Sequence, residues 1–159
     1  MNSFSLTLLI NAASTWFMVG LIWLIQVVHY PLFASVGKEQ YQNYQSQHET
    51  LITWIVGPVM LVELVSAGLL LWFSSTRTDQ YLAVVGLVLV VAIWLSTAFL
   101  QVPCHAQLAT GFDETAHRQL VAGNWIRTIA WSARGLIVGW MLARLIQSSL
   151  SSFSDVPGS

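Results

Sequence analysis

Long apolar runs, separated by short polar segments, make up most of the sequence. No charged side chain comes before Lys38, and none lies between Asp79 and Asp113. Each of these stretches holds an apolar run longer than about 18 residues, the length typical of a transmembrane helix. Two further runs are long enough and carry few charges. The pattern predicts one domain over residues 1–147, with transmembrane helices at about 3–30, 51–74, 80–102 and 122–146.

Prolines and helical spacing set the expected ends of these helices. Pro31 and Pro103 should end the first and third helices, because the residue before a proline is pushed out of the α region. Polar and aromatic residues recur at helical spacing from Tyr41 onwards, so the second helix should begin early, above the membrane. Thr110-Gly111-Phe112-Asp113 has the form of a capping box, which places the start of the fourth helix near Asp113.

We therefore expect an all-α, integral membrane four-helix bundle. Its second and fourth helices should extend beyond the bilayer on one side. The serine-rich segment at residues 148–159 is expected to be a disordered tail.

Composition and charge agree with a membrane protein. Hydrophobic residues make up 55% of the chain and charged residues only 8%, against about 25% charged in a typical soluble domain. The net charge of −1 excludes the electrostatic footprint of a nucleic-acid-binding protein. Arg77 and Arg144 lie closer to predicted helix ends than Lys38 and Arg118 do, so the positive-inside rule favours cytoplasmic termini.

A weak internal repeat relates the two halves of the chain. Glu63 lies nine residues after Trp54, and Arg134 lies nine residues after Trp125. This spacing predicts two related helical hairpins, and sites in repeat-built membrane proteins lie at the interface between the repeats.

Glu63 and Arg134 are the charged residues expected deepest in the bilayer. A carboxylate at that depth is costly unless it faces the bundle interior and has a partner, and Arg134 is expected at matching depth. Two interpretations remain open. The pair is either a catalytic centre or a structural ion pair that joins the second helix to the fourth.

All four histidines fall at the same predicted end of the bundle. His29 and His105 lie near the ends of the first and third helices, and His48 and His117 lie in the two overhangs. Imidazoles that converge from several helices can hold a metal ion or a haem iron, with His29, His48 and His105 as the candidate ligands. Histidines that face water and lipid headgroups are the alternative.

A second set of polar residues near this end favours an organic ligand. These residues can hold an anionic or carbonyl-bearing small molecule, such as a quinone. They are Gln26, Gln101, Asn124, Arg127 and Trp131.

Several short motifs resemble a known group of proteins. They are His29-Tyr30-Pro31, a histidine before the second helix, Pro103 with His105, and Asn124-Trp125-x-Arg127 followed by Trp131 and Arg134. Over about residues 20–135 the chain resembles small four-helix bacterial membrane proteins that are distantly similar to the anthrone-oxygenase group. The resemblance implies a bacterial inner-membrane protein and oxidation of polycyclic phenolic substrates.

The leading hypothesis is a membrane oxidoreductase or a protein that binds a redox ligand such as haem, a metal ion or a quinone. A small transporter or channel-like binder, and a non-catalytic subunit or assembly factor of a membrane complex, are the alternatives. The partners consistent with these functions are the lipid bilayer, a small-molecule ligand, a second copy of the chain or a larger complex.

Overall fold

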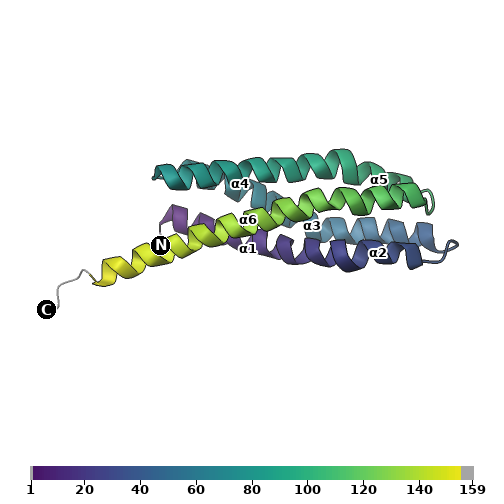
Figure 1. Ribbon diagram of the computed structural model, residues 1–159, viewed down its shortest axis with the longest axis horizontal. Coiled ribbons are helices and arrows are strands. Elements are labelled where there is room, and N and C mark those ends of the chain that lie inside the picture. Colours follow the sequence, from purple (N-terminus) through teal and green to yellow (C-terminus); the bar gives the residue numbers. More distant parts are fainter. Residues whose placement is uncertain (1, 155–159) are drawn as a thin grey trace.

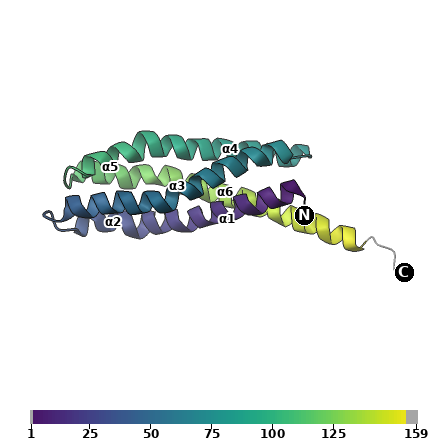
Figure 2. The ribbon, with the colours of Figure 1, turned by 180° about the vertical axis from the view of Figure 1, so that it is seen from behind.

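The computed structural model describes residues 2–154 and shows a bundle of four long helical segments (Figure 1). Its longest helices are α1 (Ser3–Leu24), α3 (Tyr41–Phe73), α4 (Arg77–Ser96) and α6 (Glu114–Ser154). The start of α1 and the end of α6 lie at one end of the bundle, and the two longer connections lie at the other (Figure 2). The predicted all-α four-helix bundle is confirmed, and four helical segments within residues 2–154 are long and apolar enough to cross a membrane.

The prediction that Pro31 and Pro103 end their helices is wrong. The first segment continues through η1 (Ile25–His29), α2 (Tyr30–Leu32) and η2 (Phe33–Ser35), and the third continues through η3 (Thr97–Gln101) and α5 (Val102–Leu108).

A π-helical turn before each proline explains this continuation. The Tyr30 N–H bonds to the Ile25 carbonyl, and the Val102 N–H bonds to the Thr97 carbonyl, each five residues back. The wider turn relieves the clash that a proline ring makes with a preceding carbonyl. Each proline then occupies the first turn of a new α-helical piece, where its missing N–H is not needed.

The early starts of the second and fourth segments are confirmed. Helix α3 begins at Tyr41 and α6 begins at Glu114. The cap of α6 differs from the predicted capping box. The Asp113 carboxylate accepts a 2.6 Å hydrogen bond from the Ala116 N–H, whereas the Thr110 hydroxyl donates to the Gln107 carbonyl. Asp113 is therefore the N-cap of α6, and Thr110 belongs to the preceding turn.

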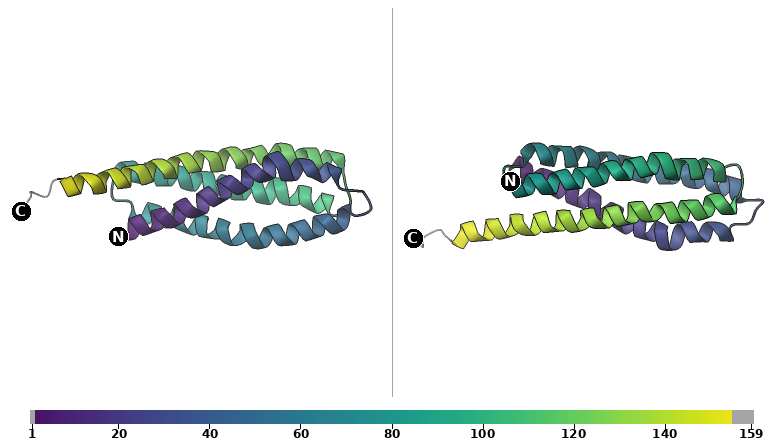
Figure 3. Two further views of the ribbon diagram at one scale, coloured as in Figure 1. Left: turned by 90° about the horizontal axis from the view of Figure 1, so that it is seen from below. Right: turned by 45° about the horizontal axis from the view of Figure 1, so that its top comes forward.

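The prediction of a disordered tail from residue 148 is wrong over residues 148–154, because α6 continues to Ser154. Leu150 and Phe153 are three residues apart in this stretch, as on one face of a helix, and the first proline of this region is Pro157. Residues 155–159 lie outside the described residues. Helix α6 consequently projects beyond the other helices, which is clear in both views of Figure 3.

Exposed tryptophans mark two levels along the bundle. Trp54 and Trp72 of α3 are 76% and 82% exposed. They are 18 residues apart, about 27 Å at the rise of an α-helix. That distance matches the thickness of the hydrocarbon core, at whose two faces tryptophan is enriched. We infer that the bilayer lies between these levels, with Glu63 midway and all four histidines beyond the Trp54 level.

This placement gives a topology that labelling can test. In a Cys104→Ser background, Lys38→Cys and Arg118→Cys should react with an impermeant thiol reagent from the same side of the membrane. Asp79→Cys should react only from the opposite side, since α3 and α4 meet there. Labelling of the first two positions from different sides would contradict the four-span topology.

Candidate functional site

The bundle contains two buried polar networks, one halfway along it and one at its histidine end. The first is centred on the predicted pair of Glu63 and Arg134, which is confirmed as an ion pair. The Arg134 Nε atom lies 2.9 Å from Glu63 Oε1, and both side chains are 1% exposed.

All four long helices contribute to this mid-bundle network. The Thr15 hydroxyl of α1 donates to Glu63 Oε1 over 2.8 Å, and the Trp131 indole N–H of α6 donates to Glu63 Oε2 over 2.9 Å. The Arg134 guanidinium also donates to the Gly86 carbonyl of α4. Both charges are thus paired and hydrogen-bonded, as burial at this depth requires.

Small polar residues complete the same network. The Asn11 amide donates to the Glu63 carbonyl and to the Ser66 hydroxyl, over 3.1 and 2.8 Å. Its oxygen accepts a longer bond from Arg134. Trp131, predicted as a ligand-binding residue beside Arg127, instead contacts Glu63, because it lies one turn deeper along α6. The mid-bundle network therefore joins the four helices and has little free hydrogen-bonding capacity.

Arg127 is the centre of the second network, at the histidine end. Its guanidinium donates to the Asn124 carboxamide oxygen, to Gln101 Oε1 over 3.2 Å and to the Tyr30 hydroxyl over 3.3 Å. The Asn124 amide in turn donates to Gln26 Oε1 over 2.8 Å. The structure therefore brings together four of the predicted ligand-binding residues and adds Tyr30 to them.

Tyr30 connects Arg127 to His105. The Tyr30 hydroxyl lies 3.0 Å from His105 Nε2, and the Gln45 amide nitrogen lies 2.8 Å from His105 Nδ1. Since an amide nitrogen can only donate, His105 Nδ1 accepts and the ring proton of neutral His105 is on Nε2. Tyr30 then accepts hydrogen bonds from both His105 and Arg127, and its own hydroxyl proton has no acceptor among the described residues.

His29 and His48 form a separate pair at the same end. His29 Nε2 lies 2.9 Å from His48 Nδ1, so one ring donates to the other. His29 is half-buried, whereas His48 is only 8% exposed. The His48 and His105 rings are 5.6 Å apart, centroid to centroid. The pair therefore extends from the bundle surface to the side of His105.

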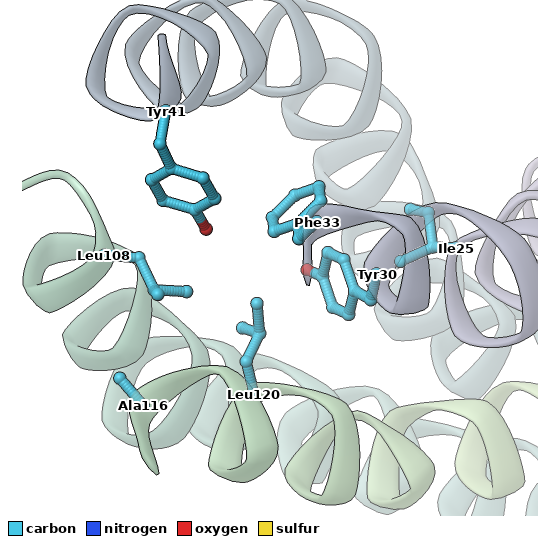
Figure 4. Packing of buried hydrophobic residues seen from close by; sticks show 7 residues of the cluster. All are labelled: Ile25, Tyr30, Phe33, Tyr41, Leu108, Ala116 and Leu120. Atoms are coloured by element: carbon cyan, nitrogen blue, oxygen red, sulfur yellow. The ribbon is translucent and has the colours of Figure 1, made fainter. Parts of the chain in front are cut away.

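Buried polar atoms without hydrogen-bond partners are concentrated at this end. Over the part of the chain that the structure describes, they are the Tyr41 hydroxyl, Gln45 Oε1, His48 Nε2, Ser96 Oγ and Gln101 Nε2. Figure 4 shows the Tyr41 side chain pointing inward, with its hydroxyl between Leu108 and Phe33. Unpaired buried polar groups are uncommon, because each costs about 1–3 kcal/mol, and a group of them suggests a site for water or a ligand.

His117 differs from the expected exposed histidine of the overhang. It is 9% exposed, and its Nε2 atom donates to the Tyr30 carbonyl over 2.8 Å. The Tyr30 carbonyl also accepts the Phe33 N–H, so His117 adds a second hydrogen bond to this carbonyl. Its contact is thus with the backbone of the first segment.

The described residues contain no group of three or more His, Cys, Asp or Glu side chains placed to hold a metal ion. The three predicted metal ligands are nevertheless neighbours. His29 and His48 face each other, and both ring nitrogens of His105 have hydrogen-bond partners.

Comparisons of the chain with protein-family models, with curated proteins and with solved structures give no match.

Several residues of the two networks were not predicted from the sequence. Asn11 and Thr15 had a detectable signal, since they are polar residues inside the first apolar run. Gln45 and Tyr41 had only helical spacing, which does not show that their polar atoms face inward. Tyr30 belonged to a recognised motif, but its hydroxyl contacts depend on where α5 and α6 lie.

Proposed function

We propose that the histidine end of the bundle binds a small redox-active molecule of the quinone class and that the protein is a membrane oxidoreductase. The observation that carries this proposal is the set of buried hydrogen-bonding groups left without partners there. Among the described residues the Tyr41 hydroxyl and the Gln101 amide are donors without an acceptor, next to the Tyr30 hydroxyl that pairs with His105 and Arg127. A ligand with carbonyl or phenolic oxygens supplies such acceptors.

The surroundings of these donors suit a flat, oxygen-bearing ring. Phe33 is fully buried, and its ring centroid lies 5.4 Å from that of Tyr30 and 6.5 Å from that of Tyr41. Aromatic side chains pack well against ring systems. The Arg127 guanidinium adds a positive charge that stabilises electron density on a ligand oxygen. The resemblance to the anthrone-oxygenase group agrees with this ligand class, because polycyclic phenols carry the same kind of oxygen.

The hydrogen bonds that the imidazoles already make favour an organic ligand over an iron or metal centre. His105 uses one ring nitrogen for Gln45 and the other for Tyr30. Binding a metal would require His105 to give up one of these hydrogen bonds. The Glu63–Arg134 pair, which a transporter would use, is 1% exposed, and both of its charged groups are hydrogen-bonded within the bundle.

We also propose that the protein lies in a bacterial inner membrane with both termini in the cytoplasm. The charge bias of Arg77 and Arg144 supports this orientation.

A Tyr41→Phe variant tests the ligand site. It removes a buried hydroxyl without a partner, so the melting temperature should stay the same or rise. Affinity for a short-chain ubiquinone should fall by about tenfold, the value of one hydrogen bond. Binding can be followed by quenching of tryptophan fluorescence in the detergent-solubilised protein.

Tyr44→Phe is the matched control, since Tyr44 is half-buried on the same helix and its ring packs against Phe33 at 5.5 Å. Its quinone affinity should equal that of the wild type. Unchanged affinity in Tyr41→Phe would contradict the proposed site. A Soret band in the purified protein would show that the site binds haem rather than a quinone. A stoichiometric metal would show that it binds a metal ion.

A further inference from the structure

A cavity of about 280 Å³ lies at the end of the bundle opposite the histidines. It lies between the start of α1, the α3–α4 connection, the start of α4 and the part of α6 near Arg144. The residues around it that matter for binding are Phe4, Thr76, Asp79, Met141, Arg144 and Leu145.

Arg144 is the cation of this cavity and is only loosely paired. Its Nη2 atom lies 3.9 Å from Asp79 Oδ1, and its side chain is 34% exposed. It makes no hydrogen bond with another described residue. A guanidinium carries five N–H donors in a fork that matches phosphate oxygens, so most of the binding capacity of Arg144 is free.

Asp79 is held by another partner. The Thr76 hydroxyl donates to Asp79 Oδ2 over 2.6 Å, and the Asp79 N–H donates back to the Thr76 oxygen over 3.1 Å. This reciprocal pair caps α4, so the carboxylate is oriented towards the start of its own helix. Within the described residues this end of the bundle carries Arg77, Arg144 and Asp79, a net charge of +1.

The other wall of the cavity is apolar. Phe4 of α1 and Met141 and Leu145 of α6 line it. Arg144 lies four residues beyond the 62%-exposed Trp140, and the α3–α4 connection follows directly after Trp72. The cavity therefore lies at the expected level of the lipid headgroups, where Phe4 and Leu145 are partly exposed.

We propose that this cavity binds the phosphate of an anionic phospholipid, with Arg144 on the phosphate and the glycerol–acyl region against Phe4, Met141 and Leu145. A guanidinium next to an apolar wall fits a ligand that carries an anionic head and a hydrocarbon part. Asp79 competes with the phosphate for Arg144 and limits the affinity. This site is independent of the proposed quinone site.

The test compares melting of the detergent-solubilised protein with short-chain phosphatidylglycerol, short-chain phosphatidylcholine or inorganic phosphate. Phosphatidylglycerol should raise the melting temperature of the wild type, and the other two should not. In Arg144→Gln the phosphatidylglycerol concentration needed for half of the shift should rise about tenfold, because a charge-assisted contact is lost.

Arg118→Gln is the matched control, because Arg118 also forms a loose surface pair, 3.6 Å from Glu114, but at the histidine end. It should respond to phosphatidylglycerol as the wild type does. Asp79→Asn should bind more tightly than the wild type, which gives an opposite sign that a folding defect cannot imitate.

Two results would overturn the proposal. One is an equal response of Arg144→Gln and the wild type to phosphatidylglycerol. The other is stabilisation by inorganic phosphate at the same concentrations, which would make the ligand a free anion. If Arg144→Gln does not fold, an Asp79→Asn protein that binds no more tightly than the wild type contradicts the proposal by itself.

Discussion

Replacing Glu63 by Gln or Arg134 by Met is expected to lower the free energy of unfolding by about 3–5 kcal/mol, because either change leaves a buried charge unpaired. The two charged atoms are 2.9 Å apart, and both side chains are 1% exposed. The loss should appear in denaturant unfolding of the detergent-solubilised protein.

The double variant Glu63→Gln/Arg134→Met should recover much of this loss, since it removes both charges together. Glu114→Gln serves as a matched control. It breaks the exposed Glu114–Arg118 pair, whose side chains are 76% and 70% exposed, and should cost at most about 1 kcal/mol. Additive losses in the Glu63 and Arg134 variants would rule out a direct interaction.

Such a pair is predictable from sequence because the membrane leaves few options for a buried charge. Glu63 lies inside an apolar run, so a partner at the same depth is required, and Arg134 is the residue that provides it. The same argument does not find Thr15 or Trp131 as further partners of Glu63. Their roles depend on how α1 and α6 are rotated about their axes, which sequence spacing alone does not fix.

Helix ends were harder to predict than helix cores. The rule for the residue before a proline predicted ends at Tyr30 and Val102, but a π turn before each proline lets the helix continue. The rule describes the backbone preference of the residue before a proline in an isolated helix. In this bundle, tertiary packing holds the helical pieces that follow Pro31 and Pro103 in place. Tyr30 and Leu108, for example, are buried in one cluster with residues of α3 and α6.

At the histidine end, too, the sequence predicted only part of the candidate site. Four histidines at one end could be predicted from their positions, but their pairing could not. The sequence predicted His29, His48 and His105 as ligands of one site, without showing which of them contact each other. In the structure His29 contacts His48, and His105 contacts Tyr30 and Gln45, since the extended start of α3 contacts both the first and the third segments.

This arrangement predicts which pairs of variants at the proposed quinone site have non-additive effects on quinone affinity. Tyr30→Phe removes the hydroxyl that faces the ligand and contacts His105 and Arg127. His105→Ala removes the donor that orients this hydroxyl and also leaves Gln45 without its contact. Each change should weaken binding of a short-chain ubiquinone by about tenfold or more, because a buried hydrogen bond to the ligand is lost or misdirected.

The double variant Tyr30→Phe/His105→Ala should bind no more weakly than the weaker single variant, since both changes act through one phenolic oxygen. His29→Ala provides the comparison, because His29 is half-buried and bonds to His48. Its effect should add to that of His105→Ala. Additivity between Tyr30 and His105, measured by fluorescence titration of folded variants, would show that they do not share one ligand contact. Non-additivity between His29 and His105 would instead restore the shared imidazole site expected from their positions in the sequence.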